Sequence, residues 1–317
     1  MSRIQEILRK AEREGAVHRT RALTVDTPAA GPVLVEPTGP GEAVVMPTQG
    51  PVGTRGVEPP AVSRVEPPPV TIPTAGLAPP LVTPAGAREV TGGIDPRLVA
   101  ALAPQSLAAE QYRSLRTRLS RSENGRAMRA IIVTSPNKGD GKTLTAANLA
   151  LTMAQEFQQR VLLVDCDLRR PSVHQLFGLV ETPGLGDVLM NAAELEQALV
   201  LLPEHHLTVL PAGLPPSNPA ELIGSSAMRR VLDTLRTRFD RILIDVPPVA
   251  PLADLHILAP MVDALLMIVR AGVTPKPAIE RALAGLDPNK ILGLVLNESG
   301  AQSDVYDTYE GYGYIAG

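Results

Sequence analysis

The chain has 317 residues, of which 44% are hydrophobic, and it carries a net charge of −3 and a single cysteine. This length allows one or two domains. The near balance of charge excludes a chain-wide attraction to nucleic acid or to an anionic membrane. Cys166 alone cannot form a disulfide framework, which favours a reducing cytoplasm. The N-terminus lacks the apolar core of a signal peptide, and the longest apolar stretch, residues 257–269, is interrupted and too short to span a bilayer.

The N-terminal part of the chain differs in composition from the rest. Residues 1–20 predict either a docking helix or a solvated helix tip, because their apolar residues recur at helical spacing (Ile4, Ile7, Leu8 and Ala11). Residues 26–86 contain 15 of the 32 prolines, and no aromatic residue precedes Tyr112. Such a segment buries too little apolar surface to offset its ordering entropy. We therefore predict a Pro-rich disordered linker over residues 21–95.

A helix is predicted over residues 104–121. One face of it is apolar and consists of Ala108, Tyr112, Leu115 and Leu119. An adjacent arc carries Glu110, Arg113 and Arg116, which are spaced by three residues. Taken alone, these charges favour an ordinary solvated face with a local ion pair of small energy.

Strands and helices then alternate along the chain. Short strands rich in Ile, Leu and Val are predicted at 130–134, 161–165, 207–210, 241–245, 264–269 and 291–296. Helices are predicted between them, notably at 142–158, 226–238 and 276–286. This alternation predicts one α/β domain over residues 96–300, built on a doubly wound, mostly parallel sheet. Ligands of such sheets bind beyond the carboxyl ends of the strands.

Residues 130–148 contain the strongest chemical signal. A short apolar strand is followed by Ser-Pro-Asn-Lys-Gly-Asp-Gly-Lys-Thr and then by a helix. Consecutive backbone N–H groups in such a turn, with the positive end of the helix, bind phosphate. Lys142 can reach the β- and γ-phosphates, and Thr143 can place its hydroxyl on Mg²⁺. The sequence thus predicts a P-loop NTPase fold that contacts a nucleoside triphosphate through Gly139, Asp140, Gly141, Lys142, Thr143 and Leu144.

The loop departs from the usual pattern at two positions. Pro136 occupies the place of the first glycine, and Gly139 lies nearer to the lysine instead. The second lysine of a related partitioning subclass would stand at Asn137, whereas this chain has Lys138 one residue later. The loop alone therefore leaves the subclass open.

Carboxylates follow two of the predicted strands. Asp165 and Asp167 end the run Val-Leu-Leu-Val-Asp-Cys-Asp, and Asp245 ends Ile-Leu-Ile-Asp. In extended geometry Asp165 and Asp167 share one side of the strand. A phosphoryl-transfer site needs one carboxylate for the magnesium shell, usually through water, and one to accept the proton of the attacking hydroxyl. The alternative is that Asp165 and Asp167 only cap the turn.

Four further polar residues are less informative. Asp254 is interpreted as a charge at a helix N-terminus, and Cys166 as a small buried apolar residue. Asn297 either bonds the nucleotide base or caps the last strand. Asn218 is either a turn residue or a nucleotide contact.

The last twelve residues contain four of the five tyrosines, Tyr306, Tyr309, Tyr312 and Tyr314. The tail over residues 301–317 lacks a hydrophobic period and is rich in glycine, which predicts flexibility. It is either an adhesive binding peptide or a set of phosphate acceptors flanked by Asp307 and Glu310. Each phosphotyrosine would add about −1.5 to −2 charges.

Together these motifs resemble the bacterial tyrosine kinases of exopolysaccharide and capsule biosynthesis. The resemblance covers about residues 105–317 and rests on Glu-Gln-Tyr-Arg-Ser-Leu-Arg, the phosphate loop, Val-Asp-Cys-Asp-Leu-Arg-Arg-Pro, Ile-Leu-Ile-Asp-Val-Pro-Pro and the tyrosine tail. It implies ATP and Mg²⁺, with Lys142, Asp165 and Asp167 catalytic. Thr143, Asp167 and Asp245 would hold the metal, partly through water, and Asp245 would be the further acidic residue of the nucleotide site. We also include Asn297 among the predicted nucleotide contacts, because it ends the last predicted strand.

The same resemblance implies that Glu110, Arg113 and Arg116 form an oligomerisation motif, which reverses the reading of this helix taken alone. It also implies a split form without the membrane-spanning part that some members carry. Such a form is cytoplasmic, peripheral to the inner face of the plasma membrane, and depends on a separate membrane chain-length regulator. No nucleic-acid partner is expected.

We therefore predict a protein-tyrosine autokinase that regulates polysaccharide polymerisation or export. A tail tyrosine of one subunit would attack ATP held by its neighbour, with Asp167 as the base. One rival is a partitioning or positioning ATPase, with a DNA face formed by the arginines at 229, 230, 236, 238 and 241. The overall charge, Asn137 and the unused tail argue against it. A second rival is a nucleotide-binding scaffold without turnover.

Overall fold

The structure is a computed structural model that describes residues 33–35, 92–122, 128–156, 159–249 and 254–299. The predicted docking helix over residues 1–20, nearly all of the linker and the tyrosine tail lie outside the described residues. The domain limits that depend on these segments therefore stay predictions.

The described residues form one eight-stranded sheet in the order β1-β8-β7-β2-β6-β3-β5-β4. The six strands from β8 to β5 run parallel to one another. They are the six strands expected from the sequence, and their ends agree within one residue. The strands are β1 (Val33–Val35), β2 (Ala130–Thr134), β3 (Val161–Asp165), β4 (Val200–Leu202), β5 (Leu207–Leu210), β6 (Arg241–Asp245), β7 (Ala264–Arg270) and β8 (Ile291–Asn297).

The two edge strands were not expected. The β1 strand pairs antiparallel with β8, and β4 pairs antiparallel with β5. Both have only three residues, which is too short for a periodic signal in the sequence. The central parallel sheet nevertheless confirms the predicted doubly wound α/β fold.

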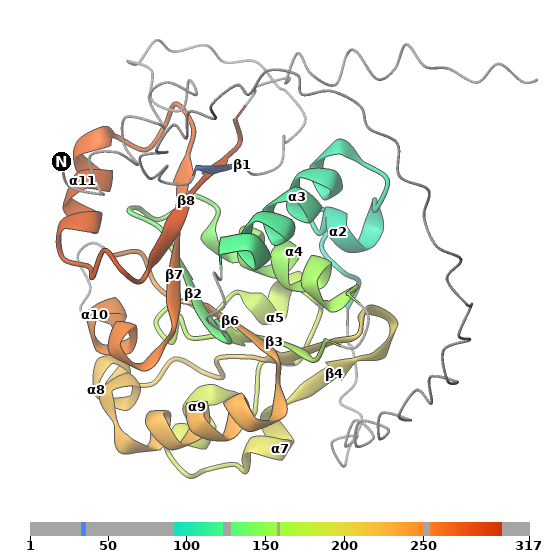
Figure 1. Cartoon of the computed structure of the whole chain (residues 1–317). Coiled ribbons are helices and arrows are strands. Elements are labelled where there is room, and N and C mark those ends of the chain that lie inside the picture. Colours follow the sequence, from blue (N-terminus) through green and yellow to red (C-terminus); the bar gives the residue numbers. More distant parts are fainter. Residues whose placement is uncertain (1–32, 36–91, 123–127, 157–158, 250–253, 300–317) are drawn as a thin grey trace, which may run out of the picture. The chain divides into compact units, whose positions relative to one another are not determined.

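Helices cover both faces of the sheet (Figure 1). Their bounds are α2 (Val99–Leu102), α3 (Leu107–Ser122), α4 (Lys142–Ala154), α5 (Val173–Leu176), α6 (Leu185–Leu189), α7 (Leu195–Ala198), α8 (Pro219–Gly224), α9 (Ser226–Arg238), α10 (Asp254–Leu258) and α11 (Lys276–Ala284). Two 3₁₀ turns, η1 (Pro203–His205) and η2 (Ala259–Met261), complete the elements. No helix among the described residues combines the length and the apolar character needed to cross a bilayer.

Three helical expectations need correction. The helix expected over 142–158 ends at Ala154, because Gln155 begins the turn that leads to β3. The helix expected over 276–286 ends at Ala284, where Gly285 follows and favours termination. In α3 the buried face includes Ala109 in place of Ala108, which is only half-buried.

Two apolar cores hold these layers together. One core packs α3 and α4 against the sheet around residues such as Leu115 and Leu149. The other packs α9 and α11 against the opposite face around Leu232 and Ile279. Because each central strand is buried on both faces, its residues are apolar along nearly their whole length.

The arrangement of the sheet determines where the polar residues gather. The parallel strands β2, β3, β6, β7 and β8 end at Thr134, Asp165, Asp245, Arg270 and Asn297, respectively. Carboxyl ends of parallel strands meet at one edge of a sheet, which is where doubly wound proteins bind ligands. The predicted nucleotide and metal residues therefore come from strand ends and loops at this edge or from the helix that begins there, whereas the predicted oligomerisation residues lie on α3.

Candidate functional site

The loop between β2 and α4 has the backbone of a phosphate cradle. Gly139 and Gly141 have φ angles of +89° and +91°, a region that favours glycine. A Cβ atom on Gly141 would also lie 2.0 Å from the side-chain nitrogen of Asn297. Both the backbone conformation and the close approach therefore require glycine here. Lys142 then begins α4, so the positive end of this helix faces the loop.

Asp140 holds the loop in shape. Its carboxylate accepts hydrogen bonds from the Asn137 N–H at 2.8 Å and from the Thr274 hydroxyl at 2.7 Å. Its carbonyl accepts a hydrogen bond from the Asn297 side chain at 3.0 Å. Burial raises the pKa of Asp140, and the two hydrogen bonds to its carboxylate oppose that shift. These contacts fix a loop whose geometry was uncertain from the sequence because Pro136 replaces the first glycine.

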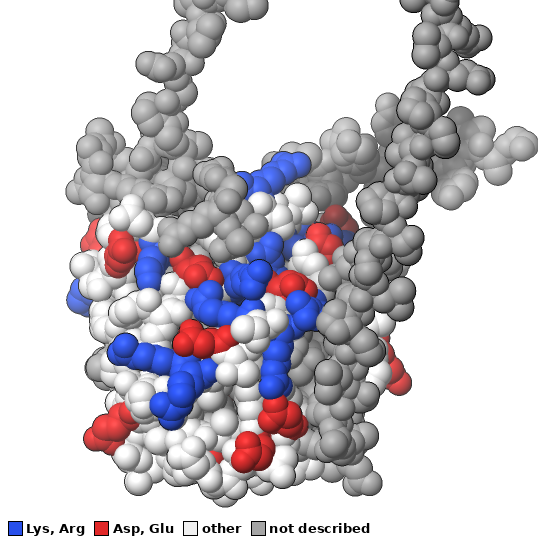
Figure 2. Space-filling view, turned by 60° about the horizontal axis from the view of Figure 1, so that its bottom comes forward, with Lys and Arg blue, Asp and Glu red and all other residues white. Residues whose placement is uncertain are grey.

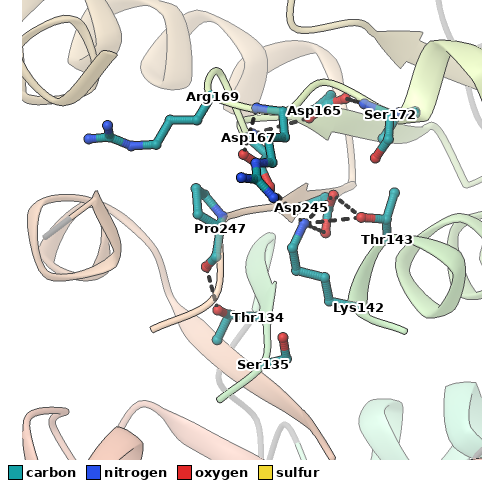
Figure 3. A network of polar contacts seen from close by, with 12 residues as sticks. Thr134, Ser135, Lys142, Thr143, Asp165, Asp167, Arg169, Ser172, Asp245 and Pro247 are labelled. Atoms are coloured by element: carbon teal, nitrogen blue, oxygen red, sulfur yellow. Dashed lines mark hydrogen bonds and ion pairs between the residues drawn. The ribbon is translucent and has the colours of Figure 1, made fainter. Parts of the chain in front are cut away.

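Lys142 lies between two carboxylates (Figure 3). Its ammonium nitrogen is 3.1 Å from an oxygen of Asp167 and 3.1 Å from an oxygen of Asp245. The Thr143 hydroxyl donates to the same Asp245 oxygen at 2.6 Å. Burial acts to lower the pKa of Lys142, but Asp245 and Asp167 outweigh it and raise that pKa. Lys142 is therefore held as a cation at the carboxyl edge of the sheet.

Asp165 has a different environment from its neighbour Asp167. It is fully buried, and in the described part of the chain its hydrogen bonds come from the backbone N–H groups of Asp167, Ser172 and Val173, at 3.0–3.1 Å. It also pairs in register with Asp245 on β6. Burial and the nearby Asp245 raise the pKa of Asp165 to about 7. The structure thus gives Asp165 a turn-capping contact and places Asp167 beside Lys142.

The oxygen atoms at this edge of the sheet are suitable ligands for a magnesium ion. The Thr143 hydroxyl and the carboxylates of Asp167 and Asp245 converge on the Lys142 ammonium group, so positive charge is already stabilised there. Hydroxyl, carboxylate and water oxygens are the ligands that Mg²⁺ prefers. Because burial raises the pKa of Asp245, a nearby divalent cation would favour its ionised form. The residues present therefore fit the expected ion.

Asp254 is more than a charge at a helix N-terminus. It is the first residue of α10, as expected, but it is fully buried and accepts hydrogen bonds from the Arg169 guanidinium at 2.9 and 3.2 Å. No spacing pattern pairs these two residues, which are 85 positions apart. The ion pair joins the segment after β3 to α10.

The structure also places the remaining ambiguous residues. Cys166 is buried and free, as expected. Asn218 is exposed and precedes α8, which agrees with a turn residue. Asn297 ends β8, but its amide group supports the phosphate loop by donating to the Asp140 carbonyl, a role outside both sequence-based alternatives. Thr274 was missed altogether, although its place just after β7 on the carboxyl side was the one available signal.

The Glu-Arg-Arg group of α3 is engaged within the chain. Arg113 bonds the Glu110 carboxylate at 2.7 Å and the Pro104 carbonyl at 2.8 Å. Arg116 donates to the Thr152 carbonyl of α4 at 2.9 Å. About half of the Glu110 side chain remains exposed. The charged arc therefore contacts the helix that begins at the phosphate loop and still offers an exposed carboxylate.

The arginines proposed for a DNA face do not form an uninterrupted basic surface. Figure 2 shows blue and red side chains intermixed on the face that lies at the bottom of Figure 1. Arg236 pairs with Asp263 at 2.8 Å, and Arg238 pairs with Glu196. Arg241 donates to the Met128 carbonyl. These partners favour a structural role for Arg236, Arg238 and Arg241.

Comparison with known proteins decides the family. Residues 128–274 match the model of the AAA domain family described as AAA_31. The chain is 37% identical to the tyrosine-protein kinase YwqD of Bacillus subtilis over 218 residues, which cover 68% of this chain and 91% of YwqD. The chain belongs to the bacterial tyrosine-protein kinases. This membership confirms the predicted family and enzyme class, and with it a nucleotide-binding site that works with a divalent metal.

Two further comparisons show how much of other kinases in this family the chain matches. The tyrosine-protein kinase Wzc of Salmonella typhi is 32% identical over 220 residues, or 69% of this chain but only 30% of Wzc. The kinase domain of the Escherichia coli tyrosine kinase ETK superposes with a TM-score of 0.62 at 28% identity, covering 65% of this chain and 81% of that structure.

Proposed function

We propose that this tyrosine kinase transfers the γ-phosphate of ATP to tail tyrosines of a neighbouring copy of itself. The observation that carries the proposal is the Lys142 ammonium group, held 3.1 Å from both Asp167 and Asp245 at the start of α4. This places a cation, two carboxylates and a helix N-terminus around one point. Phosphoryl transfer depends mostly on such positioning and charge neutralisation.

Each residue would have a separate role in the transfer. Lys142 and the N–H groups of the loop would bind the β- and γ-phosphates. Thr143, Asp167 and Asp245 would hold Mg²⁺, which supplies further neutralisation of phosphate charge. The tyrosine oxygen forms a bond to the γ-phosphorus, the bond from that phosphorus to the β–γ bridging oxygen breaks, and ADP leaves. Asp167 would accept the tyrosine proton, since it lies beside Lys142 and is less enclosed by backbone N–H groups than Asp165.

Burial limits the choice of acceptor. Tyr112, the one tyrosine outside the tail, is 4% exposed between α3 and α4, and burial raises the pKa of its hydroxyl. It cannot reach a neighbour's site without unfolding of this region. The acceptors would therefore be Tyr306, Tyr309, Tyr312 and Tyr314. Phosphates on several of them would add like charges that weaken association between subunits.

The assembly would depend on α3 and on a membrane partner. Glu110, Arg113 and Arg116 would contribute to contacts between subunits, so that one tail meets the next site. The kinase would act at the inner face of the plasma membrane through a chain-length regulator of polysaccharide export, without a nucleic-acid partner. The chain covers 91% of YwqD and 30% of Wzc, so the match to both kinases supports a role for the domain on which this assembly would depend.

A mixing experiment tests the proposal. A donor chain with its four tail tyrosines changed to Phe is incubated with Mg-ATP and an acceptor chain that carries Lys142→Met. We expect phosphotyrosine on the acceptor only when both chains are present, as detected by mass spectrometry. ATP hydrolysis without phosphotyrosine would instead support the positioning ATPase. Neither hydrolysis nor phosphotyrosine, with retained nucleotide binding, would support the scaffold.

A further inference from the structure

An unpaired arginine lies next to the proposed base. The backbone N–H of Arg170 donates to the Asp167 carboxylate at 3.1 Å, so Arg170 is held at the mouth of the site. Its side chain is exposed, and no other group in the described part of the chain bonds its guanidinium. Arg170 therefore presents a free cation within one side-chain length of Asp167.

In the described part of the chain, the other cations near the site, unlike Arg170, have carboxylate partners. Arg169 forms a two-bond ion pair with Asp254, whose side chain is 1% exposed. Lys142 is likewise neutralised, because it lies between Asp167 and Asp245. Of these three cations around the site, Arg170 alone has no carboxylate partner among the described residues. An arginine without a partner is suited to bind a carboxylate of a substrate, since its planar group can donate two parallel hydrogen bonds.

The tail supplies such carboxylates at two of its four tyrosines. Tyr306 is followed by Asp307 and Tyr309 by Glu310, whereas Gly313 and Ile315 follow the other two tyrosines. Adjacent Cα atoms are about 3.8 Å apart. When a tyrosine hydroxyl meets Asp167, the backbone of the next residue is only one Cα spacing away, so the long, exposed side chain of Arg170 can extend to its carboxylate.

We propose that Arg170 is a specificity residue that binds the carboxylate directly after the acceptor tyrosine. The inference rests on the proposed function, because it assigns the order in which that reaction uses the tail. Tyr306 and Tyr309 are then phosphorylated ahead of Tyr312 and Tyr314. The substrate class of the site is a tyrosine followed by an acidic residue.

The mixing experiment can measure this preference. The full-length donor with four tail phenylalanines is made with Arg170 or with Arg170→Glu, and the acceptor carries Lys142→Met. Phosphate on each tyrosine is followed with time by mass spectrometry. We expect the first pair of tyrosines to react about two- to fivefold faster than the second pair with Arg170, the size expected for an exposed ion pair. A donor with Arg170→Glu should lose the preference. Pairing that same donor with an acceptor that carries Asp307→Lys and Glu310→Lys should restore it.

Two controls separate this role from a structural one. Arg170→Glu keeps the backbone N–H that bonds Asp167, so only the side chain changes. Arg281→Glu makes the same charge change on α11, which contributes no residue to the site, and should leave the preference as in the parent donor. Equal rates at all four tyrosines with Arg170 present, or a proportional loss at all four with Arg170→Glu, would overturn the inference alone. No phosphotyrosine with the parent donor would overturn the proposed function as well.

Discussion

The hydroxyl of Thr274 donates a hydrogen bond to the Asp140 carboxylate at 2.7 Å, and both side chains are buried. Thr274 follows β7, whereas Asp140 belongs to the phosphate loop between β2 and α4. The same hydroxyl accepts the Arg270 N–H at 2.9 Å. A buried carboxylate without such partners would cost free energy. The contact therefore ties the shape of the loop to the neighbouring strand before any nucleotide binds.

Thr274→Val should weaken nucleotide binding more than it changes the fold. The variant keeps the volume but leaves the Asp140 carboxylate with one donor fewer, so we expect about a five- to tenfold higher Kd for ATP, equivalent to ~1 kcal/mol. Thr274→Ser retains the hydroxyl and should restore most of the affinity. Thr152→Val is a matched control, because it removes a buried hydroxyl that bonds only the Asn148 carbonyl within α4. Calorimetric titration of all three variants checks this, and equal loss in Thr274→Ser would contradict it.

Lys142→Met should abolish phosphotyrosine formation and also lower stability in a pH-dependent way. The change leaves Asp167 and Asp245 without their cation, and breaking a buried pair costs about 3 kcal/mol. Loss of the cation raises the pKa of Asp245 further, so the destabilisation should be largest at pH 8 and shrink as this group protonates at lower pH. Urea unfolding at pH 5 and pH 8 measures the difference.

Lys290→Met provides the control for that experiment. Its ammonium group donates to the carbonyls of Ala259 and Val262 at 2.6 and 3.0 Å. Because these partners do not titrate, its destabilisation should be the same at both pH values. A pH-independent effect of Lys142→Met would contradict the coupling between the Lys142 ammonium group and the Asp245 carboxylate.

Sequence reasoning recovered the elements that repeat a strong pattern. The six buried parallel strands were predicted within one residue because each is an uninterrupted apolar run between polar loops. The phosphate loop and the residues ending β3 and β6 were predicted because their chemistry is local: Lys142 and Thr143 follow one another, and Asp165 and Asp245 end apolar strands. In contrast, the short strand β4 carries no periodic signal of its own.

The missed contacts all join distant positions. Thr274 and Asp140 are 134 residues apart, and Arg169 and Asp254 are 85 residues apart. Only the strand order brings such pairs together, and one sequence does not specify which polar side chains then meet. The exchange of Ala108 for Ala109 on the buried face of α3 has a local cause, because positions three and four residues before Tyr112 both lie near its face of the helix.

Asp165→Asn should change the pH dependence of stability in the direction opposite to that expected when an ordinary ion-paired carboxylate is replaced. The pKa of Asp165 is about 7 in the fold and close to 4 in the unfolded chain. Between these values the folded state holds a proton that the unfolded state has lost, so this group makes the parent less stable as pH rises from 4 to 7. The stability of Asp165→Asn relative to the parent should therefore increase over that window in nucleotide-free, metal-free buffer.

Asp240→Asn gives the opposite sign and serves as the comparison for Asp165. Its paired guanidinium, Arg160, holds the pKa of Asp240 below its usual value. That carboxylate contributes stability at neutral pH that is lost as pH falls through its folded pKa. The free energy of unfolding of the asparagine variant, relative to that of the parent, should therefore be lowest at neutral pH. Denaturant unfolding from pH 4 to pH 8 measures both variants, and parallel curves would refute the assigned pKa of Asp165.

Glu110→Ala and Arg116→Ala should separate association from stability. About half of the Glu110 side chain is exposed, so its removal should change the free energy of unfolding by less than about 0.5 kcal/mol while weakening self-association. Arg116 also donates to the Thr152 carbonyl of α4 at 2.9 Å, so its removal should cost about 1 kcal/mol of stability and weaken association too. Light scattering and urea unfolding of the two variants, with Arg281→Ala as a surface control on α11, provide the measurements. Unchanged association in Glu110→Ala would remove the support for an oligomerisation role of this helix.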